Sequence, residues 1–222
     1  MTHQRGVALV LVLWVVTLLS VIAGNFAFSM RGEAQIARNL LSTAQAQAQA
    51  DAGINRAWYE LMKPPTEQNR WTGDGSAHDL TLVDGLLRVT IQDESGKIDL
   101  NTASEVLLVG LFRSVGVTQD AAVALADSVQ DWRDADKLRR LNGAEEAEYL
   151  AAGKDYAPPN VPFETVDELQ RVLGMTPQVF RLLEPSLTVY SRQPGVNTAV
   201  AQRPALLAFP GVNPEMVEQF LA

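Results

Sequence analysis

The sequence predicts an α+β protein, in which a long N-terminal helix packs on a small antiparallel sheet and a helical domain is inserted into that sheet. Three observations support this class. An uncharged apolar run near the N-terminus continues as a helical pattern, short alternating segments flank Asp84-Gly85, and residues 98–185 read as mostly helical. With 222 residues, the chain is long enough for one large or two small packed units.

The N-terminal run is long enough to cross a membrane. Residues 7–28 read VALVLVLWVVTLLSVIAGNFAF and contain no charge. As a helix they would span roughly 33 Å, which matches a hydrocarbon core of about 30 Å. A cleaved secretory signal and a plain signal anchor are two possible interpretations. In a third, a peptidase cuts directly before the apolar run and leaves it in the mature chain.

The same helix is expected to continue beyond the membrane segment. Apolar and small residues recur at helical spacing from Ile36 to Leu61. Pro64-Pro65 should end the helix, because proline cannot continue its hydrogen bonding. Unbroken from residue 7 to residue 62, the helix would be roughly 84 Å long.

Short strands are expected on both sides of the helical stretch. Residues 81–84 and 86–92 place Leu, Val and Ile at alternate positions around the Asp84-Gly85 turn. Residues 187–190, LTVY, read as a further strand. Together these strands would form the small antiparallel sheet.

Two similar segments predict helix-hairpin-helix packing. Asn101-Thr102 precedes a helix and a turn at Gly116, and Asn197-Thr198 precedes a helix and a turn at Gly211. Asn and Thr would cap each helix, and the glycine would form the tight turn. Such hairpins often bind DNA phosphates, but neither turn contains lysine and the chain has a net charge of −8. We therefore expect a packing module and no nucleic-acid partner.

Composition and motifs argue against an enzyme. The chain has no cysteine, which excludes disulfides, thiol catalysis and thiolate-bound metals. It contains no Gly-x-Ser-x-Gly motif and no glycine-rich phosphate loop. No pattern places a carboxylate pair in a cleft, so we expect no catalytic residues.

An acidic stretch over residues 131–155 is a candidate metal site. Oxygen donors without Cys or His favour calcium over zinc or copper. A solvated, self-paired loop is the alternative, because basic residues such as Arg133 and Arg140 lie among the acids. The ion would be structural and would tie down a long loop. The expected ligands are Asp131, Asp134, Asp136, Asn142, Glu145 and Glu146.

The junction Arg5-Gly6-Val7-Ala8-Leu9 resembles the class III leader of type IV pilins and pseudopilins. The resemblance implies that a prepilin peptidase cuts after Gly6. It also implies that the mature chain begins at Val7 and that its N-terminus is methylated. Most pilins carry glutamate at the fifth mature residue, where it pairs with the N-terminal amine of a neighbouring subunit. Here that position is Leu11. A subunit with no neighbour above it can keep an apolar residue there, since an unpaired charge in the membrane is costly.

K-type minor pseudopilins of type II secretion share this departure, and much of the chain resembles that family. The similar stretches lie at residues 94–101, 131–136, 142–146, 159–169, 173–176 and 195–199. The resemblance implies a structural subunit at the pseudopilus tip that helps start the filament and export folded proteins across the outer membrane. It also implies I- and J-type minor pseudopilins as partners, an inner-membrane anchor with the C-terminal bulk in the periplasm, and calcium in a helix-hairpin-helix or SAM-like domain.

Two alternatives to this functional interpretation are a minor type IV or competence-type pilin that contacts DNA, and a membrane-anchored periplasmic enzyme.

The K-type interpretation predicts a definite domain order. Because the chain ends soon after the second hairpin, we expect the last part of the sheet domain to be reduced. The expected segments are a leader at 1–6, a transmembrane helix at 7–28, its periplasmic continuation at 29–63, a sheet domain at 64–97 and 186–222, and an inserted helical domain at 98–185.

Overall fold

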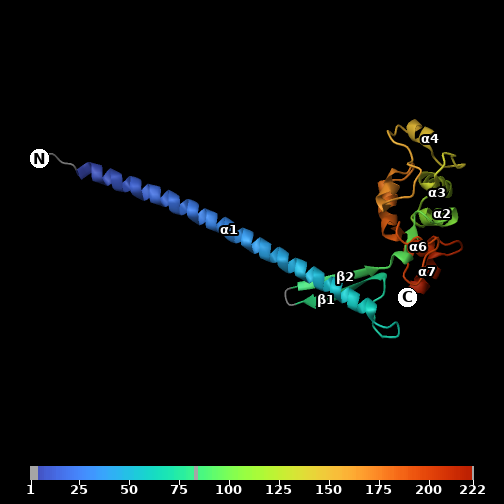
Figure 1. Ribbon diagram of the computed structural model, residues 1–222, viewed down its shortest axis with the longest axis horizontal. Helices are drawn as coiled ribbons and strands as arrows, with labels where there is room; N and C mark the ends of the chain where they lie inside the picture. Colours follow the sequence, from blue (N-terminus) through green and yellow to red (C-terminus); the bar gives the residue numbers. More distant parts are fainter. Residues whose placement is uncertain (1–4, 83–84, 222) are drawn as a thin grey trace. The chain divides into compact units, whose positions relative to one another are not determined.

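A computed structural model describes residues 5–82 and 85–221, with side chains described from residue 8 onward (Figure 1). The chain divides into two compact units. One contains Met1–Tyr59 and Leu80–Leu87, and the other contains Glu60–Asp79 and Arg88–Ala222. The predicted α+β class is confirmed, with a long N-terminal helix, a small sheet and further helices.

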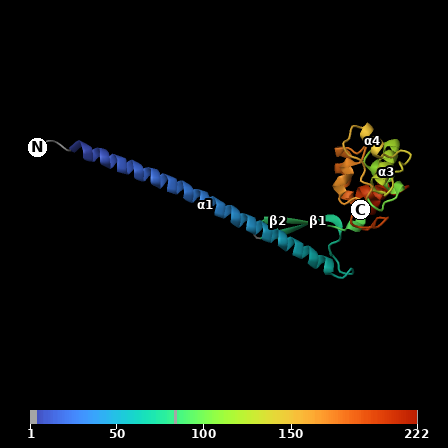
Figure 2. The same ribbon diagram turned by 45° about the horizontal axis from the view of Figure 1, so that its top comes forward.

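Helix α1 runs from Arg5 to Met62 without a break, as Figure 2 also shows. It begins two residues before the predicted start and ends where predicted, just ahead of Pro64. The glycines within it leave the helix intact because aliphatic residues, alanine and glutamine dominate the remaining positions. An 18-residue stretch within Ala8–Met62 has a mean hydropathy of 2.4 and contains no buried residue. Helix α1 is therefore long and apolar enough to cross a membrane.

Strands β1 (Asp74–Leu82) and β2 (Gly85–Gln92) form a two-stranded hairpin. The predicted hairpin is therefore confirmed, while the residues expected at its turn, 83–84, lie outside the described residues. β1 begins earlier than predicted. The prediction missed its first residues because they are polar or small and show no apolar alternation. Arg88 Nε lies 2.7 Å from Asp79 Oδ1 and links the two strands.

The strand predicted at residues 187–190 was wrong in its extent and in its partner. Only Leu187–Thr188 is a strand (β4), and it pairs in parallel with β3, Ile98–Asp99. The ladder ends because the Asp99 carboxylate accepts hydrogen bonds from Ser191 Oγ (3.2 Å) and Arg192 N (2.7 Å). These bonds turn the chain away from β3 directly after residue 190.

Among the described residues, the second unit also contains six α-helices and three short 3-10 helices. Several of these α-helices are labelled in Figure 1. Helix α2 packs closely against α3 and also against α6. The residues after β4 therefore add helices, and no strand among those described, to this unit. The α-helices are α2 (Glu105–Ser114), α3 (Gln119–Arg133), α4 (Glu146–Ala151), α5 (Pro177–Leu183), α6 (Arg203–Leu207) and α7 (Pro214–Leu221). The 3-10 helices are η1 (Glu94–Gly96), η2 (Val166–Arg171) and η3 (Glu184–Ser186).

Both predicted hairpin turns are present, and a third one was missed. Gly116 between α2 and α3, and Gly211 between α6 and α7, adopt φ values of 90° and 79°. Gly174, between η2 and α5, adopts 89° in the same way. These backbone conformations favour glycine over residues with a side chain. The apolar residue after each glycine packs against the core. These residues are Val117, Met175 and Val212.

The predicted helix caps were wrong. Ser104, and not Asn101 or Thr102, caps α2, with Leu107 N donating to its Oγ at 3.3 Å. Asn101 instead exchanges hydrogen bonds with the backbone of Phe163, which donates to Asn101 Oδ1 at 2.7 Å. Because the Asn101 side chain is hydrogen-bonded to this distant backbone, it does not cap α2, and the helix begins further along the chain. The cap predicted at Asn197-Thr198 is also wrong, because Gln202 is the residue that directly precedes α6.

Candidate metal centre

Helix α3 carries an acidic face that is buried. Asp127 and Asp131 lie one turn apart on the same side of the helix. Both side chains are almost fully buried, and Asp131 is 0% exposed. Buried carboxylates require hydrogen bonds or counter-charges. The segments that surround α3 must therefore supply them.

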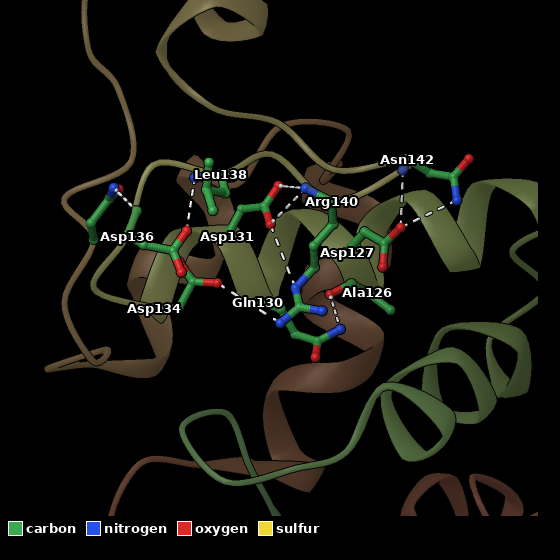
Figure 3. A network of polar contacts seen from close by, with 10 residues as sticks. Ala126, Asp127, Gln130, Asp131, Asp134, Asp136, Leu138, Arg140 and Asn142 are labelled. Carbon is green, nitrogen blue, oxygen red and sulfur yellow. Dashed lines mark hydrogen bonds and ion pairs between the residues drawn. The ribbon is translucent and has the colours of Figure 1, made fainter.

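The loop that follows α3 supplies these partners through its backbone (Figure 3). The amides of Arg140 and Asn142 each donate a hydrogen bond to an aspartate of α3, which fixes this part of the loop against the helix, whereas the Leu138 amide donates within the loop to Asp136. The bonds join Arg140 N to Asp131 Oδ2 (3.2 Å), Asn142 N to Asp127 Oδ2 (3.0 Å) and Leu138 N to Asp136 Oδ1 (2.7 Å).

Three buried side-chain oxygens in this region have no hydrogen-bond partner. They belong to Asp134 at the end of α3, Glu145 at the start of α4, and Asn160 in the segment before η2. An unsatisfied buried polar group costs about 1–3 kcal/mol. Asn160 also has a φ of 55°, and its Nδ2 donates to the carbonyl of Asp136. The three oxygens therefore come from three separate segments near the same acidic loop.

The acids of this region oppose one another's ionisation. Burial, reinforced by the charge of Asp134, raises the pKa of Asp131 from 3.8 to about 6. Burial raises the pKa of Asp134, and the charge of Asp136 adds to this effect. Burial likewise raises the pKa of Glu145, with contributions from Asp131 and Asp134. A divalent cation would relieve this repulsion and would be bound by hard oxygen donors.

The structure brings four of the six predicted ligands into one electrostatic cluster: Asp131, Asp134, Asp136 and Glu145. Asn142 is directed instead to Asp127, and its Nδ2 donates to Asp127 Oδ2 at 3.2 Å. Glu146 is exposed in the first turn of α4. Within residues 5–82 and 85–221, no three acidic or histidine side chains form a ready-made metal site. The donors suit calcium, but their side chains would have to close around the ion.

Sequence reasoning missed two polar residues of this region, Asp127 and Asn160. Asp127 lies one helical turn before Asp131, so helical periodicity could have placed it on the acidic face. Asn160 belongs to a proline-rich segment, and its position beside the acidic loop depends on the path of the chain around the domain. No local pattern indicates that approach.

The residues predicted to take part in processing and assembly lie in α1. Gly6 and Val7 are in its first turns, whereas residues 1–4 of the expected leader lie outside the described part. Leu11 is 62% exposed, like the apolar residues around it. From Ala8 to Met30 the helix thus presents uncharged side chains on all sides, which is typical of a membrane segment.

Comparisons with known proteins agree on one family. Residues 91–192 match the family model described as type II secretion system (T2SS), protein K. The chain is 28% identical to type II secretion system protein K of Klebsiella pneumoniae, over 94% of this chain and 71% of that protein. It is 27% identical to the protein of the same name from Pseudomonas aeruginosa, over 98% of this chain and 72% of that protein.

A solved structure has a similar fold. It is the GspK-GspI-GspJ complex of the type 2 secretion system of enterotoxigenic Escherichia coli. The match has a TM-score of 0.58 at 19% identity, and it covers 77% of this chain and 67% of the matched chain. At this identity the likeness concerns the fold.

Proposed function

This chain belongs to the type II secretion system protein K family, and we propose that it forms the tip of the pseudopilus and helps start that filament. Members of the family are minor pseudopilins, which are structural subunits and not enzymes. The proposed role is to begin the short filament that helps export folded proteins across the outer membrane. The observation that carries the tip position is Leu11.

Leu11 supports a tip position for an electrostatic reason. In pilins, the carboxylate at the fifth mature residue pairs with the N-terminal amine of the subunit above. A first subunit has no such amine, and an unpaired acid within the membrane costs about 2.5–3.5 kcal/mol on insertion scales. Leucine at this position, within an uncharged helix, avoids that cost.

The proposed location is the inner membrane, with a single crossing. The apolar half of α1 would cross the bilayer, and both the rest of α1 and the second unit would lie in the periplasm. A prepilin peptidase would remove the leader after Gly6 and leave Val7 as the mature N-terminus. These steps follow the family's mode of assembly.

The proposed partners are the I- and J-type minor pseudopilins. The similar solved structure is a complex of GspK with GspI and GspJ, and this chain presents a suitable surface for such neighbours. Apolar residues of the periplasmic half of α1 remain more than half exposed, including Ile36, Leu40, Ile54 and Trp58. Burying such side chains against neighbouring helices would favour assembly.

We also propose a structural calcium ion in the helical domain. Asp131, Asp134, Asp136 and Glu145 would hold it, since they are oxygen donors whose charges already oppose one another. Asn142 and Glu146, expected as ligands from the sequence, would join only by leaving their present positions. The ion would tie the end of α3 to the start of α4.

Complex formation with variants at Leu11 tests the proposed function. The full-length chain is co-expressed with the I- and J-type pseudopilins of its own bacterium, and the complex is purified in detergent. Wild type and Leu11→Ile should give the same yield of complex, whereas Leu11→Glu should lower it because its carboxylate has no amine to pair with. Equal or greater assembly of Leu11→Glu would contradict the tip position.

A further inference from the structure

Arg140 is the counter-ion of two carboxylates in the acidic cluster. Its Nε lies 3.5 Å from Asp131 Oδ1, and one of its terminal nitrogens lies 3.8 Å from Asp134 Oδ2 (Figure 3). These separations are too long for good hydrogen bonds, so the guanidinium acts mainly through its charge. The Arg140 side chain is also 41% exposed, which leaves it a path into solvent.

The backbone of Arg140 contacts the same carboxylate. Its amide donates to both oxygens of Asp131, at 3.3 Å and 3.2 Å. On the other side, Gly143 leaves space for Asp131, since a Cβ atom there would stand only 2.0 Å from Asp131 Oδ2. Asp131 is thus fixed in place by the backbone of residues 140–144, which includes the amides of Arg140 and Ala144. A cation would need these same oxygen atoms.

The positive charge of Arg140 does not satisfy the whole cluster. Glu145 is only 8% exposed, and its Oε1 has no hydrogen-bond partner. The Oδ1 atom of Asp134 is also buried without a partner. Asp134, which pairs with Arg140, and Glu145, which interacts with Asp131 and Asp134, therefore each keep one oxygen atom for a further positive group. A divalent ion can reach several oxygens at once, whereas one guanidinium reaches two carboxylates here.

We infer that Arg140 is a built-in competitor for the cation, whose binding at Asp131 and Asp134 displaces the Arg140 side chain into solvent. This inference rests on the proposed calcium site. In the metal-free protein the guanidinium limits repulsion between the two buried acids. When the ion binds, the same guanidinium must leave, and this exchange weakens the affinity for the ion.

Replacing Arg140 by a neutral residue should therefore have two opposite effects. Arg140→Gln removes the charge but keeps the backbone amide that anchors Asp131. Without calcium, this variant should unfold at a lower temperature than wild type, because Asp131 and Asp134 lose their counter-charge. With calcium, it should bind the ion about tenfold more tightly, because no guanidinium has to be displaced.

Arg139→Gln is the matched control. It makes the same change in net charge at the adjacent residue. Arg139 is 49% exposed and pairs with Glu148, at 3.4 Å, instead of with the acids of the cluster. Any general effect of removing one positive charge is therefore shared by both variants. The difference between the two variants isolates the competition at Asp131 and Asp134.

The experiment measures calcium affinity by calorimetry on the full-length protein in detergent, with thermal unfolding in chelator. We expect the dissociation constant of Arg140→Gln to be about tenfold lower than that of Arg139→Gln, with a lower unfolding temperature in chelator. Arg140→Met, a second neutral variant, replaces Arg140→Gln if near-ultraviolet circular dichroism shows that the latter does not fold. Arg140→Lys should stay close to wild type, because it keeps the charge.

Equal affinities in the Arg140 and Arg139 variants, or weaker binding after Arg140→Gln, would overturn the inference. Absence of calcium binding in every variant would overturn it together with the proposed ion. Neither result would bear on assembly with the I- and J-type pseudopilins, which the Leu11 variants measure separately. Failure of this inference and failure of the tip function are therefore distinguishable.

Discussion

At the scale of single residues, the candidate site shows which contacts a sequence can predict. Asp131, Asp134 and Asp136 are neighbours in the chain, so their clustering follows from local geometry. The direction of Asn142 could not be predicted, because the nearest acceptor for it is Asp127 on a different turn of α3. Asn160 arrives from a distant segment, and its position depends on the complete fold.

Gly143 is a residue at which added volume should disturb the site. A Cβ atom there would stand 2.0 Å from Asp131 Oδ2, so Gly143→Ala must displace the carboxylate. We expect it to lower the free energy of unfolding by about 1–3 kcal/mol. Chemical denaturation measures this change. Gly195→Ala is the control, since no atom lies within 4 Å of its added Cβ, and an equal loss in both variants would contradict this account.

The raised pKa of Asp131 predicts how stability depends on pH. The folded-state pKa is about 6 and the ordinary value is 3.8, so the folded protein binds this proton more tightly than the unfolded chain does. In chelator, the contribution of Asp131 to stability is therefore fully present below pH 3.8 and is lost as the pH rises through about 6. The raised pKa values of Asp134 and Glu145 act in the same direction.

Thermal unfolding of wild type and Asp131→Asn in chelator, over this pH range, measures the contribution. The asparagine side chain does not titrate, so the stability of the Asp131→Asn variant should fall less steeply than that of wild type as the pH rises. Parallel curves for the two proteins would show that Asp131 titrates normally. Calcium should flatten the wild-type curve, because ion binding favours the ionised carboxylate.

At the scale of elements, the length of a repeating pattern decides what can be predicted. Helix α1 follows from a long apolar run and a terminal proline pair, and its predicted end at Met62 is confirmed. Strand β4 is only two residues long, so its partner is chosen by tertiary contacts and not by its own sequence. The third glycine turn, at Gly174, was missed because η2 before it is a short 3-10 helix.

The contact between α2 and α6 yields a prediction at this scale. Gly110 lies in α2, and a Cβ atom there would stand 1.9 Å from the carbonyl oxygen of Ala208 at the end of α6. Gly110→Ala should therefore destabilise the protein by about 1–3 kcal/mol, although alanine normally favours a helix over glycine. Chemical denaturation of the full-length protein measures the change.

Gly32→Ala is the matched control for the α2 prediction. Gly32 is also helical, and no atom lies within 4 Å of its added Cβ. It should leave stability unchanged or raise it by up to about 1 kcal/mol. If Gly110→Ala were as well tolerated as Gly32→Ala, the close packing of α2 and α6 would be wrong.

At the scale of the whole molecule, the sequence predicted the parts better than their arrangement. A long apolar helix, a hairpin and a helical domain were all expected, and the family comparisons support the same interpretation. The helices α6 and α7 after β4 were only partly foreseen, through the second hairpin segment. The packing of α6 onto α2 depends on Ala205 and Leu206 reaching a core built by residues far earlier in the chain, and α7 packs against α6.

Leader processing gives a prediction for the complete protein. Gly6→Ala should block removal of the leader, because the proposed cleavage follows that glycine. The unprocessed chain should accumulate in the membrane and fail to form the proposed complex with I- and J-type pseudopilins. Immunoblotting of membrane fractions distinguishes the two forms. A normally processed Gly6→Ala variant would contradict the proposed cleavage site.

The N-terminus of the mature protein tests the central claim most directly. Mass spectrometry of the protein from the membrane fraction should find a chain that begins at Val7, with or without a methyl group. That result is expected only if the apolar helix is retained after prepilin-type processing. A chain that still begins at Met1, or one that begins near residue 30, would contradict assembly as a pseudopilin.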